Sequence, residues 1–296
     1  CNRHHFSVLN YHRVMPSNGQ ECTQALDPLI FEQQLIWLKK LFRVLSLQDA
    51  LKLAKENRLP RNVVVITIDD GFKDCFNYVF PLLQKHELTA TFFITTSGLK
   101  NGYLWESQIS QCFTYLNPNI RQITLGKKTF DWTDSNSQNN AIQRMTELIK
   151  YQPLIQRQQL LDELSKQLNS SIDHLDTFLT PAELKQMYKA GMTIGAHTVN
   201  HPILNLEKPE IAFNEIAYSK EELEKIIGAP IHFFAYPNGK FEVDFTSEHV
   251  QMVKDLNFQA AFSTEWGLVD FNNDNPFLLK RFTPWDQDPS RFCLRL

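Results

Sequence analysis

The chain lacks an excess of basic residues and any long apolar run. Its 30 Lys and Arg stand against 33 Asp and Glu, which gives a formal net charge of −3. A protein that neutralises the phosphates of nucleic acid needs a basic surface, so we expect no nucleic-acid partner. No apolar run approaches the roughly 18–20 residues that a membrane-spanning helix requires. The sequence therefore predicts no transmembrane segment.

Cysteine is scarce, and its spacing shows no pairing. The five cysteines form no CxxC motif, and an odd number cannot all form disulfides within one chain. Cys75 and Cys112 lie in apolar sequence, where we expect buried free thiols. Cys1 has two open interpretations: the acylated first residue of a processed lipoprotein, or the point at which a longer chain was cut. Both interpretations stay open, and a location in the cell envelope or periplasm is slightly favoured over the cytoplasm.

Short apolar runs alternate with stretches of helical periodicity, which is typical of repeated βα units and a mostly parallel sheet. The run VVVITI is apolar without alternation, as in a strand covered on both faces. The strands that we predict are residues 6–10, 63–68, 91–95, 192–196, 231–235, 259–263 and 277–282. Seven or so strands are few enough to close as a barrel, and α/β barrels commonly reach this length of 296 residues as one domain.

The helical segments show recognisable starts and stops. Residues 31–42 place apolar side chains every three or four positions, as on one face of a helix. Thr180, Pro181 and Glu183 supply an N-cap, a first-turn proline and the third residue of a capping box. A further helix is predicted over residues 209–228, where a glycine suits its C-terminal stop.

Between about residues 100 and 180 the rhythm of strands lapses. Residues 131–140 (DWTDSNSQNN) are polar and loop-like, and helical patterns lie on either side of them. The βα pattern resumes afterwards. We therefore interpret residues 1–296 as a single domain whose barrel carries an insertion at approximately 100–180.

Polar clusters follow directly on three predicted strands. They are Asp69-Asp70, His197 with His201, and Tyr236-Pro237-Asn238-Gly239. In barrels built from βα units the C-terminal strand ends converge on one face, and active sites lie there. We therefore expect the three clusters to meet, although they are far apart in the chain.

The residue types suit hydrolysis at a metal site. Two imidazoles and one carboxylate can hold a divalent cation with coordination positions left open, so that a bound water becomes more acidic and a carbonyl is polarised. A neighbouring carboxylate can accept the proton of the attacking water. Each cluster also has an ordinary structural explanation, because Asp-Asp-Gly and Tyr-Pro-Asn-Gly are turn sequences and His-x-x-x-His is common on helices. Their shared position after strands favours the site.

These motifs resemble those of the polysaccharide deacetylase family, also called the NodB-homology or carbohydrate esterase family 4 enzymes. Thr67 to Gly71 is similar to the family's acidic first motif, and His197 to His201 is similar to its His-[Ser/Thr]-x-x-His motif. Ala235 to Gly239 matches in part an Arg-x-Pro-x-Gly turn, and Tyr11 to Val14 resembles an opening strand of one branch. The resemblance spans roughly residues 6–285 apart from the insertion. It implies a distorted (β/α)7-type barrel.

The resemblance also implies roles for the matching residues. Asp69 would be the catalytic base, and Asp70, His197 and His201 would hold the metal, zinc in the first place, with cobalt or nickel as alternatives. The backbone N–H of Asn238 would donate to the oxyanion, an interaction typically worth about 3 kcal/mol or more. The turn residues Tyr236 and Pro237 would line the substrate site.

The chain departs from the family pattern at two positions. Ala235 stands where the third motif has the arginine that orients the base. Arg281 follows a predicted strand and is our candidate to replace it, with a surface arginine after an edge strand as the open alternative. The family's late histidine, its general acid, is absent, because the last histidine is His249, which we expect to be exposed on a helix. His12 follows the first strand and is our candidate for the acid, although such a histidine also often only bonds a loop.

Tryptophans could contribute to sugar binding. Of Trp105, Trp132, Trp266 and Trp285 we favour Trp105 and Trp285, which lie in loop-like sequence beside a carboxylate, although a tryptophan more often anchors a core or a loop. The resulting hypothesis is a metal-dependent N-deacetylase that acts on N-acetylated amino sugars of a bacterial polysaccharide or related glycan. Two alternatives remain: a deacetylase of a small amide or O-acetyl ester, and a glycan-binding protein that kept the fold and lost catalysis.

Overall fold

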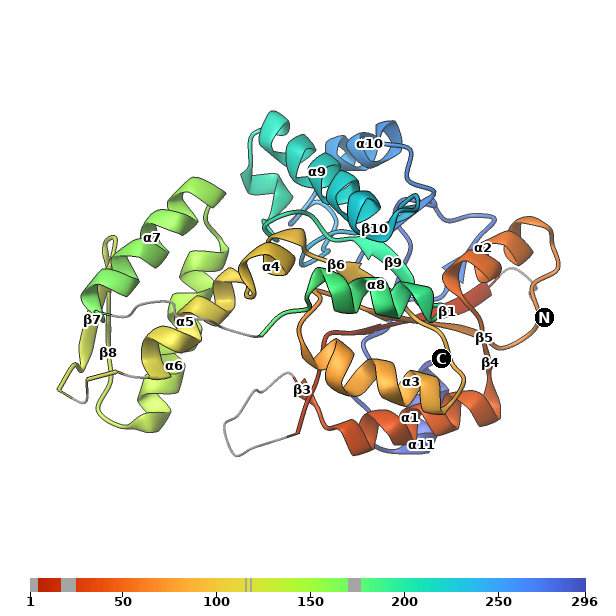
Figure 1. The fold of residues 1–296 in the computed structure, drawn as a ribbon, viewed down its shortest axis with the longest axis horizontal. Helices are drawn as coiled ribbons and strands as arrows, with labels where there is room; N and C mark the ends of the chain where they lie inside the picture. The colour runs from red at the N-terminus through yellow and green to blue at the C-terminus, as the bar shows by residue number, and fades with distance from the viewer. Residues whose placement is uncertain (1–4, 17–24, 115, 118, 170–176) are drawn as a thin grey trace.

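The computed structural model describes residues 5–16, 25–114, 116–117, 119–169 and 177–296, so the interpretation of Cys1 lies outside the described residues. Its centre is a curled sheet of eight strands (Figure 1). The strands in the sheet are β1 (His5–Tyr11), β4 (Arg43–Val44), β5 (Val63–Ile68), β6 (Thr91–Ile94), β9 (Thr193–Ala196), β10 (Phe233–Ala235), β11 (Ala260–Phe262) and β12 (Val269–Asp270). No described helix is both long and apolar enough to cross a membrane.

The strand order is β11-β10-β9-β6-β5-β1-β12, and β4 pairs with the start of β5. All pairings in this sheet are parallel except that of β1 with β12. β5 has its six residues buried, because helices cover one face of the sheet and the barrel interior covers the other. The predicted fold class, an α/β distorted barrel, is confirmed as a curled, mixed half-barrel.

An extended segment bridges β11 and β1. Leu279 bridges to Phe262 of β11, and Phe282 bridges to Leu9 of β1. Backbone bonds Asn10 N–H to Phe282 O (2.8 Å) and Phe282 N–H to Val8 O (2.7 Å) fix the β1 side. The prediction of a regular strand at residues 277–282 is therefore wrong. The backbone of this segment forms hydrogen bonds with both β11 and β1, so it makes isolated bridges instead of a regular strand.

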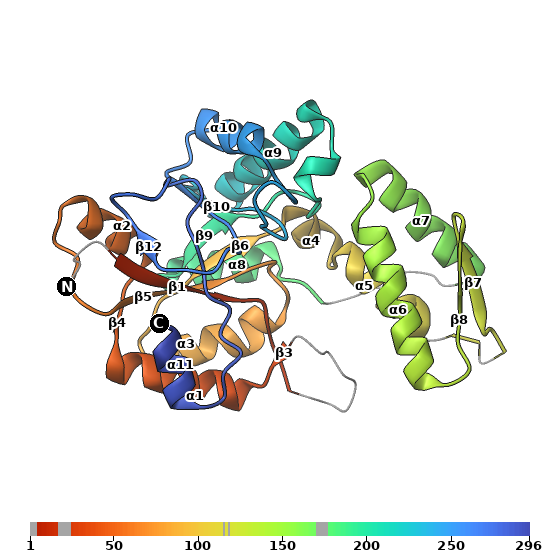
Figure 2. The same cartoon turned by 180° about the vertical axis from the view of Figure 1, so that it is seen from behind.

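Helices surround the half-barrel, with α1, α3 and α11 on one side and α9 and α10 on the other (Figures 1 and 2). They and the other helices near the sheet are α1 (Pro28–Leu41), α2 (Leu47–Lys55), the π-helix Cys75–Val79, α3 (Phe80–Lys85), α4 (Thr96–Asn101), α8 (Pro181–Lys189), the 3₁₀ turn η2 (Leu204–Leu206), α9 (Pro209–Ile227), α10 (Ser247–Asp255) and α11 (Pro289–Arg295). A small ladder pairs β2 (Arg13–Val14) with β3 (Ala25–Leu26).

The helix ends follow the sequence signals closely. Thr180 and Glu183 form the predicted capping box at the start of α8. Gly228 ends α9 in the left-handed conformation, at φ 73°. Cys75 and Cys112 are buried free thiols, as predicted.

A side lobe stands beside the half-barrel, and it contains α5 (Trp105–Thr114), β7 (Gln122–Leu125), β8 (Lys128–Asp131), α6 (Ser135–Lys150) and α7 (Leu154–Gln167) (Figure 1). Its buried side chains form a core of their own, from Trp105 to Leu168. The loop predicted at residues 131–140 is wrong from Ser135 onward. Asp134 caps α6 there, and the polar residues that follow it form the first turns of this amphipathic helix. The single domain with its insertion stays a prediction.

Candidate metal centre

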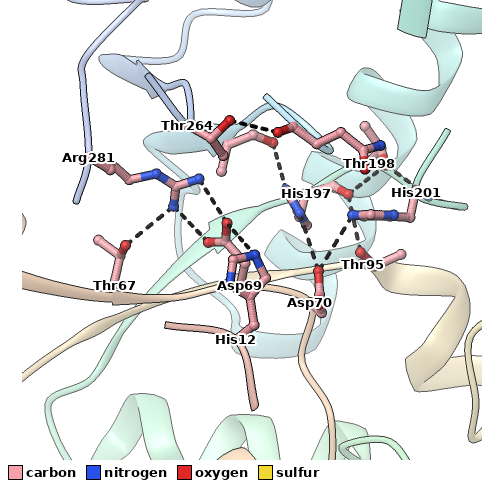
Figure 3. Close-up of polar contacts among 12 residues, drawn as sticks. His12, Thr67, Asp69, Asp70, Thr95, His197, Thr198, His201, Thr264 and Arg281 are labelled. Carbon is pink, nitrogen blue, oxygen red and sulfur yellow. Dashed lines mark hydrogen bonds and ion pairs between the residues drawn. The ribbon is translucent and has the colours of Figure 1, made fainter. Parts of the chain in front are cut away.

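A tight turn at the end of β5 separates the two neighbouring carboxylates. Asp70 has φ 77° and Gly71 has φ 99°, a region that L-residues rarely adopt. A side chain on Gly71 would press on Ile94 and Phe178, which lie 3.1 Å from the position of its Cβ. Asp69 consequently faces the barrel interior toward Arg281, whereas Asp70 faces the two histidines (Figure 3).

The histidines lie in the irregular loop that follows β9. His197 is the first residue after the strand and is 2% exposed, and His201 lies at φ 53° three residues before the 3₁₀ turn. Thr198 links them, because its hydroxyl donates to His197 O and accepts from His201 N–H (3.0 Å).

Asp70, His197 and His201 form a possible metal site. One ligand atom from each lies within 4.8 Å of the others. Oδ1 of Asp70 lies 3.5 Å from Nε2 of both histidines and is buried without a hydrogen-bond partner (Figure 3). A buried carboxylate oxygen without a donor is costly, and a divalent cation among the three groups would satisfy it. The donor set therefore fits a metal, and the structure does not identify which metal.

Burial and the neighbouring carboxylates act differently on the two imidazoles. Nδ1 of His197 lies 2.7 Å from the carbonyl of Ala235, so Nδ1–H donates there and Nε2 faces Asp70. Burial lowers the pKa of His201 to about 3, which leaves its ring neutral. Burial also depresses the pKa of His197, but Asp70 and Asp69 outweigh it and raise that pKa above its ordinary value. Burial opposes ionisation of Asp70, yet the two histidines hold its pKa well below the usual range.

Asp69 forms a buried, two-pronged ion pair with Arg281. Nη1 and Nη2 of Arg281 each lie 2.8 Å from one carboxylate oxygen. Nε of Arg281 donates to Ser263 O at 2.9 Å, and Nη1 also reaches Thr67 Oγ1 at 3.3 Å. Burial would raise the pKa of Asp69, but the guanidinium and His197 hold it below its ordinary value. Asp69 is therefore ionised at neutral pH. The structure thus places Arg281 against both carboxylate oxygens of Asp69.

His12 and the turn after β10 border the same centre. Nε2 of His12 lies 4.0 Å from Oδ2 of Asp69, and its side chain is 40% exposed. Asn238 has φ 61°, and its carbonyl accepts from Thr264 Oγ1 at 2.7 Å. Its backbone N–H has no acceptor among the residues that the structure describes, so it is available to a ligand.

Three predicted substrate-binding side chains are placed away from solvent. Tyr236 is fully buried, stacks on Phe245 at 3.7 Å between ring centroids, and donates its hydroxyl to Phe277 O. Pro237 is also buried. Trp105 is 7% exposed, because it packs in the core of the side lobe. These side chains lie in the protein interior, and their contact with substrate stays a prediction.

Two further predictions have different outcomes. Trp285 is 57% exposed, so its ring is accessible and its binding role stays a prediction. His249 is 4% exposed, so the prediction that it faces solvent is wrong. Its Nδ1 accepts from Thr246 N–H at 3.0 Å in the capping box of α10.

The sequence analysis missed two buried charges beside the histidine loop. Arg157 on α7 donates to the carbonyls of Asn200 and His201, and Glu215 on α9 accepts from the backbone of the same loop. A signal for them exists. Arg157 shares a helix face with Leu161 and Leu164, and a charge on an otherwise apolar face indicates a specific partner.

The comparisons with known proteins identify the family. A family model described as polysaccharide deacetylase matches residues 56–261, more than half of the chain. The chain belongs to the polysaccharide deacetylase family.

Relatives of this polysaccharide deacetylase family member differ in how much of the chain they match. YxkH of Bacillus subtilis (strain 168), named provisionally as a polysaccharide deacetylase, is 21% identical over 262 residues, 88% of this chain and 64% of that protein. A poly-beta-1,6-N-acetyl-D-glucosamine N-deacetylase of Staphylococcus aureus (strain MSSA476) is 31% identical over 102 residues, 30% of this chain and 35% of that protein. The chain thus spans less than two thirds of the length of either relative.

Solved structures share the fold of this polysaccharide deacetylase family member. The Streptococcus pyogenes deacetylase PplD, in complex with acetate, superposes with a TM-score of 0.67 at 21% identity, over 98% of this chain and 97% of that one. IcaB from Ammonifex degensii superposes with a TM-score of 0.64 at 20% identity, over the same shares of the two chains.

Proposed function

We propose that this protein is a metal-dependent N-deacetylase of amino sugars in a bacterial polysaccharide or related glycan. The observation that carries the proposal is the ionised Asp69, held by Arg281 beside the cluster of Asp70, His197 and His201. A base next to a metal site is the arrangement that hydrolysis of an unactivated amide needs. The staphylococcal relative supports an N-acetylated glucosamine polymer as the substrate class.

In the proposed reaction, one group of residues holds the cation. Asp70, His197 and His201 would hold the cation, with zinc as the first candidate and cobalt or nickel as alternatives. A divalent cation bound there supplies Lewis acidity, which polarises the acetamide carbonyl and makes water more acidic.

Residues of the chain then accept and donate the protons of the reaction and stabilise the charge that develops on the oxyanion. Asp69 accepts the proton of the attacking water, and Arg281 keeps both carboxylate oxygens in place. The N–H of Asn238 donates to the oxyanion of the tetrahedral intermediate. His12 protonates the amine nitrogen as acetate leaves. Trp285 offers an exposed ring for the neighbouring sugar.

The direct test is acetate release by the purified chain supplied with zinc. Substrates are poly-N-acetylglucosamine, chitooligosaccharides and acetylxylan, which separate N-deacetylation from O-deacetylation. Asp69→Asn should abolish acetate release while metal remains bound, and Asp270→Asn, which alters a carboxylate paired with His5, should leave activity unchanged. Full activity of Asp69→Asn would overturn the proposed base.

The two alternatives make different predictions in the same assay. A deacetylase of O-acetyl esters would release acetate from acetylxylan and not from the amide polymers. The absence of the family's late histidine favours a second alternative, a glycan-binding protein without turnover. It would bind glycan without metal and release no acetate with zinc, cobalt or nickel.

A further inference from the structure

The loop that carries His201 depends on outside groups for its shape. Residues 198–201 belong to no helix or strand. Thr198 at φ 66° and His201 at φ 53° occupy the left-handed region, where side chains other than glycine are strained. Such conformations persist only where the surrounding structure holds them. The partners of this loop therefore decide where the imidazole of His201 lies.

Backbone groups hold the first half of the loop. The carbonyl of Thr198 accepts from Thr96 N–H at 3.2 Å, and that of Val199 accepts from Ser97 N–H at 2.9 Å. Both donors lie in the first turn of α4. Because both bonds join backbone groups, they do not depend on the side chains of Thr96 and Ser97.

Arg157 of α7 bonds the carbonyls of the second half. Nη2 of Arg157 donates to Asn200 O at 2.5 Å, and Nη1 donates to His201 O at 3.1 Å. The guanidinium lies 5.0 Å from the ring centre of Trp105 and is 5% exposed. Burial lowers the pKa of Arg157 to about 10, so it stays charged at neutral pH. Arg157 and Trp105 both come from the side lobe.

Glu215 of α9 holds the amide groups of the same loop. Its Oε2 accepts from Val199 N–H at 3.1 Å and from Asn200 N–H at 2.7 Å, and its Oε1 accepts from Asn200 Nδ2 at 2.7 Å. A buried cation thus holds the carbonyls of the loop, and a buried anion holds its amides. Within the loop, His201 N–H donates to Thr198 Oγ1 at 3.0 Å, but this bond does not involve the carbonyls of Asn200 and His201.

We propose that Arg157 is a positioning residue for the metal ligand His201, and that the side lobe thereby completes the metal centre. This rests on the proposed function, in which His201 binds the cation. Loss of the guanidinium would free the carbonyls of Asn200 and His201 together. The strained backbone could then relax and carry the imidazole away, while Asp70 and His197, which Arg157 does not bond, stay in place.

The test measures the zinc dissociation constant of the full chain by competition with a chromophoric chelator. Arg157→Met should weaken zinc binding about 10- to 100-fold, the usual effect of removing a group that orients a ligand. Arg157→Lys keeps the charge and a single donor nitrogen, and it should recover part of the affinity. Arg144→Met removes an exposed guanidinium that lies over Phe130 in the same lobe, and it should bind zinc like the wild type. Wild-type affinity in Arg157→Met would overturn the proposal.

A double-mutant cycle separates positioning from a general loss of stability. In a His201→Ala background the ligand is already gone, so Arg157→Met should weaken zinc binding no further. Equal losses in both backgrounds would assign Arg157 to general stability and overturn the proposal. Where Arg157→Met does not fold, Arg157→Lys takes its place in the cycle. A wild-type chain that binds no zinc would overturn the metal centre itself, which distinguishes the two failures.

Discussion

Arg281 donates from both terminal nitrogens to the two carboxylate oxygens of Asp69, a residue 212 positions earlier in the chain. Both residues are almost completely buried, at 1% exposure each. The positive charge of Arg281 balances the negative charge of Asp69, and the carboxylate stays unprotonated. The pair also ties the segment that bridges β11 and β1 to the end of β5. The same contact therefore serves catalysis in the proposed function and closure of the half-barrel.

The first prediction concerns the stability of this ion pair. Arg281→Met should lower the free energy of unfolding by about 3–5 kcal/mol, because it leaves the Asp69 carboxylate buried and unpaired. The measurement is urea denaturation at pH 7. In an Asp69→Asn background the same substitution should cost clearly less, since no charge is stranded. Equal costs in the two backgrounds would contradict direct coupling of the pair.

The second prediction tests His12 as the proton donor. His12→Gln should slow amide deacetylation about 10²- to 10⁴-fold, the usual contribution of a general acid. It should leave hydrolysis of p-nitrophenyl acetate nearly unchanged, because that leaving group departs without a proton. His86→Gln, which alters a histidine paired with Glu32, is the matched control. If His12→Gln slowed both substrates equally, His12 would serve the structure and not proton transfer.

The third prediction concerns Glu106, in the first turn of α5. Burial, together with the charge of Asp70, raises its pKa from 4.5 to about 7. Between these values the folded chain keeps a proton that the unfolded chain releases, so stability falls as pH rises through that window.

Glu106→Gln carries no ionisable group and should escape this loss. Relative to the wild type, its free energy of unfolding should rise by about 1–3 kcal/mol between pH 4.5 and 8. The measurement is denaturation in the presence of EDTA, so that no cation competes with the proton. Glu147→Gln, at an exposed position of α6, should follow the wild-type pH dependence. A constant difference between Glu106→Gln and the wild type would contradict the raised pKa.

The fourth prediction concerns metal and stability. Zinc at 100 times its dissociation constant should raise the free energy of unfolding by about 2.7 kcal/mol, because it binds only the folded chain. Asp70→Asn removes the anionic ligand and should abolish this gain, which thermal unfolding with and without zinc measures. Asp162→Asn, at an exposed position of α7, should keep the gain. A full gain in Asp70→Asn would place the cation elsewhere.

Much of the architecture could be predicted because it rests on local patterns. The residues 63–68 form β5 as predicted, since a strand covered on both faces must be apolar throughout. Thr180 and Glu183 mark the start of α8, because a capping box satisfies specific backbone groups. The meeting of Asp70 with His197 and His201 followed from one topological rule, that the ends of parallel strands share a face.

The predictions that are wrong or stay open concern features that only the packed chain defines. Trp105 stands beside a carboxylate in the sequence, but its ring packs on the guanidinium of Arg157 and within the lobe. The first turns of α6 are polar because they face solvent, and polar sequence without a visible apolar stripe resembles a loop. The bridge at Leu279 and Phe282 depends on the distance between two strand edges, which no local pattern encodes.

The position of the closing segment has a consequence for truncated forms of the chain. The match to the family model ends at residue 261, before Arg281, and begins at residue 56, after β1. A fragment cut to those limits would retain the acidic, histidine and turn motifs, yet it would lose a neighbouring strand and the only guanidinium that bonds Asp69 among the described residues. The shortest fragment that folds and keeps Asp69 paired with Arg281 therefore has to extend at least from His5 to Phe282.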